Sequence, residues 1–295
     1  MLAPGSHVPV MLSESLEYLA IKPDGVYLDS TAGLGGHAAA IAARLTTGLV
    51  LACDRDRESL ALAKENTREF AGRIHFHQVR FSRAKEALAA EGVSQLDGLL
   101  ADLGVSRYQL TSGERGFSLM AEGPLDMRMD RGVDHIRGAT AADLVNFESE
   151  KGLADLIYKF GEERRSRQIA RAIVHARPIT TTVHLAKVIE GVARRTGKIH
   201  PATQTFMALR MAVNGEMEEL DALLESIPRM VKAGGRAVVL TFMSLEDRKV
   251  KQGFQAMARS GRARILTRHV VRPAELEIRD NPAARSAKLR AVELI

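Results

Sequence analysis

The sequence predicts an α/β fold, a doubly wound parallel sheet interrupted by an inserted all-helical domain. In the first hundred residues short apolar strands alternate with helical stretches, which indicates parallel strands joined by right-handed crossovers. From about residue 107 to residue 205 only helical patterns occur, and strand patterns return near residue 235. The length of 295 residues also exceeds the usual size of one domain.

The elements follow from apolar runs, periodicity and turn residues. Strands are expected at 26–28, 49–53, 73–79, 96–102, 235–242 and 289–295. Helices are expected at 57–70, 82–91, 141–146, 152–160, 166–175 and 183–194, and in a long stretch through Glu216, Glu219 and Leu223. The predicted organisation is therefore a sheet domain of residues 1–106 and 206–295, with residues 107–205 as the helical insertion.

A glycine-rich turn follows the first strand and opens a helix. It runs from Asp29 to His37 and carries glycines at 33, 35 and 36, which let a backbone approach a ligand closely. The second strand ends in Asp54, about 20 residues further on, where an acid can bind a ribose diol. Together these features predict a nucleoside-cofactor site.

The spacing of this turn bears on which cofactor binds. A dinucleotide site requires G-x-G-x-x-G, whereas this chain has Gly33-x-Gly35-Gly36-His37. The pattern D-x-x-x-G-x-G from Asp29 looks like the S-adenosylmethionine loop of class I (Rossmann-like) methyltransferases. There the carboxylate of Asp29 suits the cationic amino-acid end of the cofactor, and Asp54 suits its ribose. A nicotinamide cofactor and a tight turn without a ligand are the alternatives.

Three acids end three predicted strands, namely Asp29, Asp54 and Asp102. Ligands of open α/β sheets bind outside the carboxyl ends of the strands, so an ordered set of acids there predicts a functional site. Phe81 follows the third strand closely and either belongs to the core or faces an adenine. The single cysteine, Cys53, lies beside the expected ribose site, and we interpret it as a buried filler.

The segment from Asp102 to Ser106 stands where amino methyltransferases carry their acceptor-site motif. It lacks the Asp/Asn-Pro-Pro-aromatic pattern of the DNA enzymes, which disfavours a DNA-modifying enzyme of that type. Methylation of a cytosine carbon needs a cysteine nucleophile, and Cys53 is misplaced for that role. These exclusions leave direct transfer of a methyl group to a nitrogen or an oxygen atom. Such transfer requires alignment of the reacting atoms and an acceptor for the departing proton.

Charge and composition bear on partners and location. The net charge of +6 and a pI near 9.6 favour a polyanionic partner, although many bacterial proteins are mildly basic without one. The absence of tryptophan and an aromatic content of 4% argue against a base-stacking platform, so arginine–phosphate contacts should dominate. No metal cluster, transmembrane run or signal peptide is visible in the sequence, and one cysteine fits a reducing cytoplasm. We expect a cytoplasmic protein.

Along essentially its whole length the chain resembles the bacterial ribosomal small-subunit methyltransferase H family, also called MraW. The blocks that carry the resemblance are His7-x-Pro9-Val10, the turn ending in His37, Asp102 to Ser106, Arg115 to Ser118, Gly123 to Asp130, Gly161 to Arg164, His200 to Thr203, Ser244 to Arg248 and Asn281-Pro282-x-x-Arg285-Ser286. The resemblance implies methylation of the exocyclic N4 amine of a cytidine in 16S ribosomal RNA of the small ribosomal subunit. It also implies S-adenosylmethionine as methyl donor without a metal.

The resemblance further implies specific site residues. The implied cofactor contacts are Gly35, Gly36, His37, Asp54, Phe81, Asp102 and Gln109. We expect the target base to turn out of its stack beside Asp102, which is the candidate hydrogen-bond acceptor for the amine, with Ser106 and its neighbouring carbonyls as the alternative. The helical insertion is implied to recognise the RNA. The oligomeric state, monomer or homodimer, is left open.

Several blocks also have purely structural interpretations. His37 could cap the helix that follows it, and the block from Asp126 to Asp130 could be a salt-bridged turn. The arginines at 164, 165, 167 and 171 could form a solvated helix face instead of contacting RNA, because Glu162 and Glu163 partly offset them.

Departures from the family pattern occur outside the cofactor loop. Arg107-Tyr108 stands where Ser-Pro is expected, Met243 where histidine is usual, and Ala283 where arginine is usual. These departures motivate a second hypothesis, a ribosome-assembly factor that binds S-adenosylmethionine without turnover. A methyltransferase acting on protein or DNA is the third.

Overall fold

The computed structural model describes residues 9–130, 139–193 and 200–295. His7 and Arg194, which the sequence motifs and the expected helix 183–194 include, lie outside these residues. The chain divides into two compact units, one of residues 1–104 with 218–295 and one of residues 105–217. The expected domain limits of 1–106, 107–205 and 206–295 stay a prediction.

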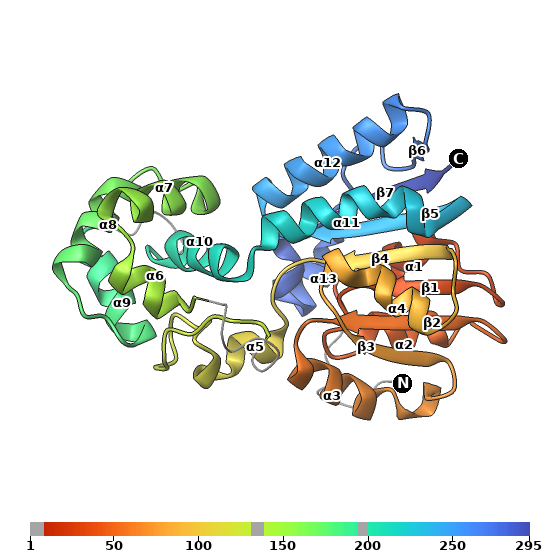
Figure 1. Cartoon of the computed structure of the whole chain (residues 1–295), viewed down its shortest axis with the longest axis horizontal. Helices are drawn as coiled ribbons and strands as arrows, with labels where there is room; N and C mark the ends of the chain where they lie inside the picture. The colour runs from red at the N-terminus through yellow and green to blue at the C-terminus, as the bar shows by residue number, and fades with distance from the viewer. Residues whose placement is uncertain (1–8, 131–138, 194–199) are drawn as a thin grey trace. The chain divides into compact units, whose positions relative to one another are not determined.

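The first unit is built on a seven-stranded sheet (Figure 1). Its strands are β1 (Val26–Asp29), β2 (Leu49–Asp54), β3 (Ile74–Gln78), β4 (Leu96–Asp102), β5 (Val231–Thr241), β6 (Ala263–Ile265) and β7 (Lys288–Leu294). The strand order is β3-β2-β1-β4-β5-β7-β6, and β3, β2, β1, β4 and β5 pair in parallel. The predicted α/β class with a Rossmann-like methyltransferase sheet is confirmed.

The last strand corrects the expectation of a parallel sheet. β7 is antiparallel to both β5 and β6. After β6 the chain runs along β7 as far as the bridge between Val271 and Leu289, and residues 272–287 then lead to Lys288, which pairs with Thr241 at the edge where β5 ends. The chain therefore enters β7 from that edge and runs against its neighbours. The three-residue strand β6 is an addition to the elements that the sequence predicts.

Helices cover both faces of the sheet. On one face, α1 (Leu12–Leu19), α2 (Gly36–Ala42) and α3 (Arg57–Asn66) share a core with inward residues of six strands, such as Val50, Leu100, Val238 and Leu289. On the other face, α4 (Ala84–Ala90) contacts β2, and α12 (Ser244–Arg259) contacts β5 and β7. α11 (Glu216–Met230) lies beside α12 (Figure 1). Apolar residues alternate between the faces, as the period of two in a strand requires.

The edge where the parallel strands end carries short additional elements. Here α13 (Glu275–Asp280) and the 3₁₀ turn η4 (Pro282–Ser286) precede β7.

The expected helix 57–70 ends at Asn66 and is followed by η1 (Arg68–Phe70), because the hydroxyl of Thr67 donates to the carbonyl of Ala63. The expected helix 82–91 begins with the 3₁₀ turn η2 (Phe81–Arg83).

The second unit is helical, as expected. Its helices are α5 (Arg107–Thr111), α6 (Ala141–Phe147), α7 (Glu150–Gly161), α8 (Ser166–His175), α9 (Thr182–Glu190) and α10 (Thr203–Asn214), with the 3₁₀ turn η3 (Gly113–Arg115). The amphipathic faces of α7, α8 and α9 bury Ile157, Ile173 and Leu185 in one core. In the described part of this unit the only β pairing is a single bridge between Pro124 and Thr181. None of the described helices, in either unit, has the length and apolar character needed to cross a membrane.

Candidate functional site

The three predicted acids lie together at the carboxyl edge of the sheet. Asp29 pairs in register with Ala52 of β2 and Leu100 of β4. Asp54 comes two residues after Ala52, and Asp102 comes two residues after Leu100. Asp54 and Asp102 therefore lie on the two strands next to Asp29, two residues closer to the carboxyl edge. Because side chains two residues apart point to the same face, all three carboxylates project to the face covered by α1, α2 and α3.

Thr31 connects two of these acids. Its hydroxyl oxygen accepts a hydrogen bond of 2.6 Å from the backbone amide of Asp102. The Thr31 amide donates to Oδ1 of Asp29 at 3.1 Å, and the Thr31 hydroxyl is 3.4 Å from the same oxygen. Oδ2 of Asp29 and Oδ1 of Asp102 are both buried, and neither accepts a hydrogen bond of standard geometry from a described residue, although the amide of Ala38 lies near enough to Asp29 to lower its pKa. Each of these two oxygens is thus available to a donor from a ligand.

Asp54 fixes the glycine turn to the start of α3. Its Oδ2 accepts from the amide of Gly33 at 2.8 Å, and its Oδ1 accepts from the amide of Asp56 at 2.9 Å. Asp56 in turn caps α3 by accepting from the amide of Glu58. Gly33 adopts φ of +51°, a conformation that glycine reaches without the strain of a side chain.

His37 faces the same edge. The buried imidazole donates from Nε2 to the carbonyl of Val10 at 3.2 Å, and its Nδ1 lies 3.8 Å from Oδ2 of Asp102. The interpretation of His37 as a helix cap is wrong, because Gly35 is the N-cap of α2 and the imidazole binds the carbonyl of Val10 instead. The amide of Met11, next to Val10, donates to Oε1 of Glu277 in α13, so the segment that holds His37 is itself anchored.

The pKa values of all three acids are raised. Burial raises the pKa of Asp102 to about 8, and the charges of Asp29 and Glu246 add to the rise. Burial raises the pKa of Asp29 to about 7, with hydrogen bonds from Thr31 opposing the rise and the charge of Asp54 adding to it. Burial likewise raises the pKa of Asp54 to about 6, against the hydrogen bonds from Asp56 and Gly33. Acids that repel one another in a buried site favour a cationic ligand.

Glu246 is a fourth acid of this site, which the sequence analysis missed. It is buried at the start of α12, where its Oε2 accepts from the amides of Phe242 and Met243 at 3.0 and 3.1 Å. Met243 is the N-cap of α12, and Glu246 occupies the third helical position of the capping box. A glutamate at that position is a recognisable start signal, but its burial and its effect on Asp102 require the folded structure.

The remaining predicted residues are placed as follows. Gly35 has φ of +88°, and Gly36 packs against Pro9. Phe81 is half-buried in η2 after β3. Gln109 belongs to the second unit, where it is buried and forms a capping box with Ser106 at the start of α5. Its assignment as a cofactor contact, like that of the other site residues, stays a prediction.

Other predicted features lie away from the acid cluster. Cys53 is buried, as expected, and burial raises the pKa of its thiol. Arg128 forms two hydrogen bonds to the carboxylate of Asp126, as in a salt-bridged turn. Among the described residues, no group of three or more His, Cys, Asp or Glu side chains is arranged to hold a metal ion.

The hydrogen-bond acceptors of this site fit S-adenosylmethionine. Two unpartnered carboxylate oxygens, on Asp29 and Asp102, suit a ligand that carries an ammonium and a sulfonium group. An added Cβ at Gly33 meets nothing closer than the carbonyl oxygen of Thr31 at 3.7 Å, so open space lies beside the backbone of the turn at this position.

Comparison with known proteins identifies the family. The model of the MraW methylase family matches residues 5–295. The chain belongs to this family. It is 58% identical over 288 residues to the ribosomal RNA small subunit methyltransferase H of Solibacter usitatus, covering 98% of this chain and 99% of that protein. It is 47% identical to the protein of the same name from Acidobacterium capsulatum, covering 97% and 98% of the two chains.

Among solved structures, a putative rRNA methylase from Clostridium thermocellum aligns with a TM-score of 0.48 and 11% identity, covering 98% of this chain and 100% of that chain. Family membership makes the chain a methyltransferase with S-adenosylmethionine as its methyl donor, as the sequence predicted.

Proposed function

We propose that this MraW-family protein methylates the exocyclic N4 amine of a cytidine in 16S ribosomal RNA of the small ribosomal subunit, in the bacterial cytoplasm. The observation that carries the site assignment is the cluster of Asp29, Asp54 and Asp102 with its two unpartnered buried oxygens. The names of the relatives support small-subunit RNA as the substrate.

In this proposal the acids divide the work of binding the methyl donor. Asp29 holds the ammonium of the amino-acid end and Asp54 holds the ribose hydroxyls, since each carboxylate oxygen can accept a second hydrogen bond. Gly35, Gly36, His37, Phe81 and Gln109 complete the contacts. The bound S-adenosylmethionine supplies an activated methyl group, so the protein's task is alignment and charge.

Asp102 is the proposed catalytic residue. The lone pair of a cytidine N4 is delocalised into the ring, so a hydrogen-bond acceptor beside the amine favours its nucleophilic form. Asp102, neutral near pH 7 when no ligand is bound, becomes ionised when a cation lies beside it and then accepts the amine proton. Burial and the neighbouring acids thus prepare Asp102 to take up a proton after the methyl donor has bound.

The deciding experiment is methylation of small ribosomal subunits that lack the mark. Purified protein is incubated with these subunits and S-adenosylmethionine labelled in the methyl group, and the RNA is digested to nucleosides. We expect label in N4-methylcytidine, and we expect Asp102→Ala to abolish it. The matched control is Asp97→Asn in the same strand, because Asp97 pairs with Lys22 and Lys232 at the opposite edge of the sheet.

Other outcomes would overturn the proposal in distinct ways. Label in a different nucleoside, in naked DNA or in protein would assign another substrate. Cofactor binding without label, together with tolerance of Asp102→Ala in cells, would establish the non-catalytic assembly factor that Arg107-Tyr108 and Met243 motivate. Met243→His would then test whether turnover returns.

A further inference from the structure

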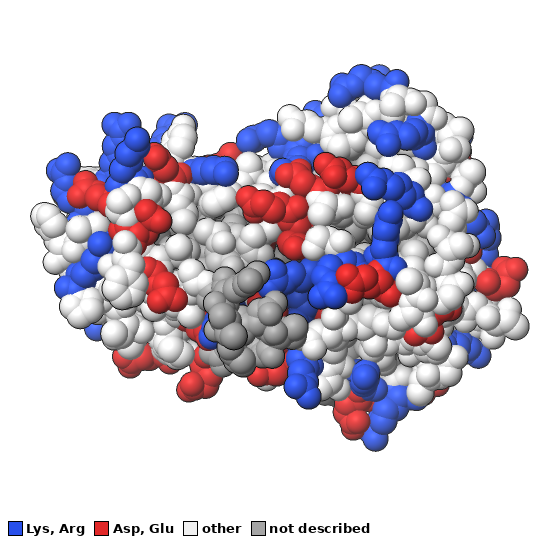
Figure 2. Space-filling model, in the orientation of Figure 1, with Lys and Arg blue, Asp and Glu red and all other residues white. Residues whose placement is uncertain are grey.

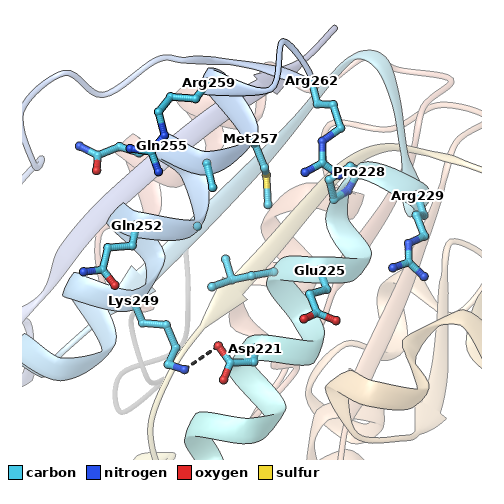
Figure 3. A pocket seen from close by; sticks show the side chains of 13 residues that line it. Asp221, Glu225, Pro228, Arg229, Lys249, Gln252, Gln255, Met257, Arg259 and Arg262 are labelled. Atoms are coloured by element: carbon cyan, nitrogen blue, oxygen red, sulfur yellow. Dashed lines mark hydrogen bonds and ion pairs between the residues drawn. The ribbon is translucent and has the colours of Figure 1, made fainter.

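A groove runs between α11 and α12, on the first unit and outside the acid cluster (Figure 3). It has a volume of about 800 Å³. One end is lined by Asp221 and Lys249, and the other end by Arg229, Arg259 and Arg262. Figure 3 shows Arg259 on the α12 side of this second end, Arg229 on the α11 side and Arg262 between them, where both helices finish.

The two ends of the groove differ in charge. Nζ of Lys249 lies 2.5 Å from Oδ1 of Asp221, so these two charges neutralise each other. At the arginine end, Nε of Arg262 donates to the hydroxyl of Ser260, and its guanidinium pairs with no carboxylate of the described chain. The guanidinium groups of Arg229 and Arg259 form neither a hydrogen bond nor an ion pair with any described residue. Three cations therefore line this end of the groove, and no described carboxylate is bonded to any of them, although Glu225 also lines the groove.

The surface around the groove follows the same division of charge. Figure 2 shows acidic side chains mixed with basic ones where α11 and α12 begin, whereas blue side chains predominate toward the ends of the two helices. A polyanion that approaches this face is therefore attracted to the arginine end of the groove.

The lining favours a hydrophilic anion over an apolar peptide. Leu224 and Met257 lie in the groove but are only 6% and 4% exposed, so they offer no anchor for a hydrophobic side chain. Two amide side chains, Gln252 and Gln255, add further hydrogen-bond donors. Arginine forks match phosphate oxygens geometrically, and most protein–nucleic acid hydrogen bonds go to the phosphate backbone.

The groove is far from the proposed catalytic edge. Two residues separate α12 from β5, whose Leu240 pairs with Asp102, and the helix ends at Arg259. A helix of 16 residues spans about 24 Å, so the arginine end lies roughly this far along α12 from Asp102. At about 3.4 Å per base step this corresponds to about seven steps along a nucleic acid strand. Any phosphate bound there belongs to RNA well away from the target base.

We propose that the arginine end of this groove binds the phosphodiester backbone of folded small-subunit RNA at a distance from the target cytidine. The identity of the RNA rests on the proposed function, whereas the preference for a phosphate chain rests on the groove itself. Arg229, Arg259 and Arg262 supply the contacts. The groove thereby makes the enzyme recognise a folded RNA substrate and not only the nucleotides around the target.

The test is the triple substitution Arg229→Gln, Arg259→Gln and Arg262→Gln in the full chain. Binding to small subunits and to protein-free 16S RNA is measured by filter retention between about 50 and 200 mM salt. We expect the affinity for both to fall about tenfold or more, and the slope of log K against log salt to become shallower by about 2–3, since three phosphate contacts are lost. The KM for subunits should rise while kcat and S-adenosylmethionine affinity stay unchanged.

The matched control is Arg44→Gln, Arg68→Gln and Lys85→Gln, which removes the same charge from exposed positions elsewhere on this unit. It should leave RNA affinity nearly unchanged. A second variant, Glu225→Gln, removes an acid from the groove and should strengthen RNA binding, because an acid repels a phosphate chain.

Three results would overturn the proposal. The first is equal loss of affinity in the groove variant and the control, which would indicate net charge alone. The second is loss of binding to subunits but not to protein-free RNA, which would assign a ribosomal protein to the groove. The third is weaker binding after Glu225→Gln. Absence of N4-methylcytidine with the wild-type protein would instead contradict the proposed function, and the binding measurements would still decide on the groove.

Discussion

Nδ1 of His37 lies 3.8 Å from Oδ2 of Asp102, while Nε2 of the same ring donates to the carbonyl of Val10. Because the carbonyl of Val10 can only accept, Nε2 carries the hydrogen of that bond, and Nδ1 is turned toward a carboxyl group whose pKa burial raises to about 8. The His37 ring therefore faces Asp102 beyond hydrogen-bond distance, while burial and the charges of Asp29 and Glu246 raise the pKa of Asp102.

The first prediction concerns the pH dependence of cofactor binding. Below pH 8 the free enzyme holds a proton on Asp102 that a cationic ligand must displace. The affinity for S-adenosylmethionine should therefore rise between about pH 6.5 and 8, by up to about tenfold per pH unit for each proton released, and level off above. Calorimetry in two buffers of different ionisation enthalpy measures the protons directly. The Asp102→Asn variant should release fewer protons on binding, and its affinity for S-adenosylmethionine should rise less with pH. An unchanged number of released protons would contradict the assignment of the titration to Asp102.

The second prediction concerns stability. Asp29 has an unfolded pKa near 3.8 and a folded pKa of about 7, so the folded state binds more protons between these values. Stability from this group is consequently lost as pH rises from about 4 to 7 and stays low above. Asp29→Asn should raise the free energy of unfolding of the ligand-free protein at about pH 8, on the order of 2 kcal/mol, with a smaller gain near pH 4. Thermal unfolding across this range measures it.

The same substitution should weaken cofactor binding, because the unpartnered Oδ2 of Asp29 is proposed to hold the ammonium group. A gain in stability together with a loss of affinity is typical of a functional site whose charges repel one another in the absence of ligand. Loss of stability in the Asp29→Asn variant at the same pH would show that the hydrogen bonds from Thr31 to the carboxylate stabilise the fold by more than the burial of its charge costs.

Much of the fold follows from local sequence signals. The strand predicted at 96–102 is Leu96–Asp102 in the structure, and the helix predicted at 166–175 is Ser166–His175. Both have strong apolar periodicity. α1 is absent from the predicted elements, because its N-cap Met11 adopts φ of +49° and supplies no capping side chain, so no start signal exists. The direction of β7 depends on the path of residues 266–287, which no local pattern encodes.

The site was predictable only in part, because some of its contacts join residues that are far apart in the sequence. Asp29, Asp54 and Asp102 are identifiable in the sequence because each ends a strand, and parallel strand ends share one edge. The hydroxyl of Thr31 accepts from the amide of Asp102, and the charge of Glu246 raises the pKa of Asp102. Both residues are far from Asp102 in the sequence. Such contacts depend on register and rotamer, so they emerge only from the folded structure.

The third prediction separates the charge of Glu246 from its capping role. Glu246→Gln keeps an oxygen that can accept from the amides of Phe242 and Met243 but removes the charge that raises the pKa of Asp102. We expect the pH midpoint of methyl transfer to move down by about half to one unit, with little change in melting temperature. Glu246→Ala should also lose the cap and cost about 1 kcal/mol. An unchanged pH midpoint in Glu246→Gln would mean that the charge does not reach Asp102.

The fourth prediction compares two glycines of the cofactor turn. An added Cβ at Gly36 collides with the ring of Pro9, whereas at Gly33 it meets no atom closer than 3.7 Å and suffers only from the φ of +51°. Gly33→Ala should therefore cost about 1 kcal/mol, from backbone strain alone. Gly36→Ala should cost roughly twice that, because Pro9 must move and it adjoins Val10, the acceptor for His37.

The collision also has a functional consequence that the strain at Gly33 lacks. Displacing Pro9 shifts the Val10 carbonyl and so releases the His37 ring that faces Asp102. Gly36→Ala should then alter the pH profile of S-adenosylmethionine binding as well as lower the melting temperature, whereas Gly33→Ala, compared at equal fractional folding, should keep the profile. Calorimetric titration of both variants from about pH 6.5 to 9 distinguishes the two effects. Identical profiles would show that His37 keeps its orientation without Val10.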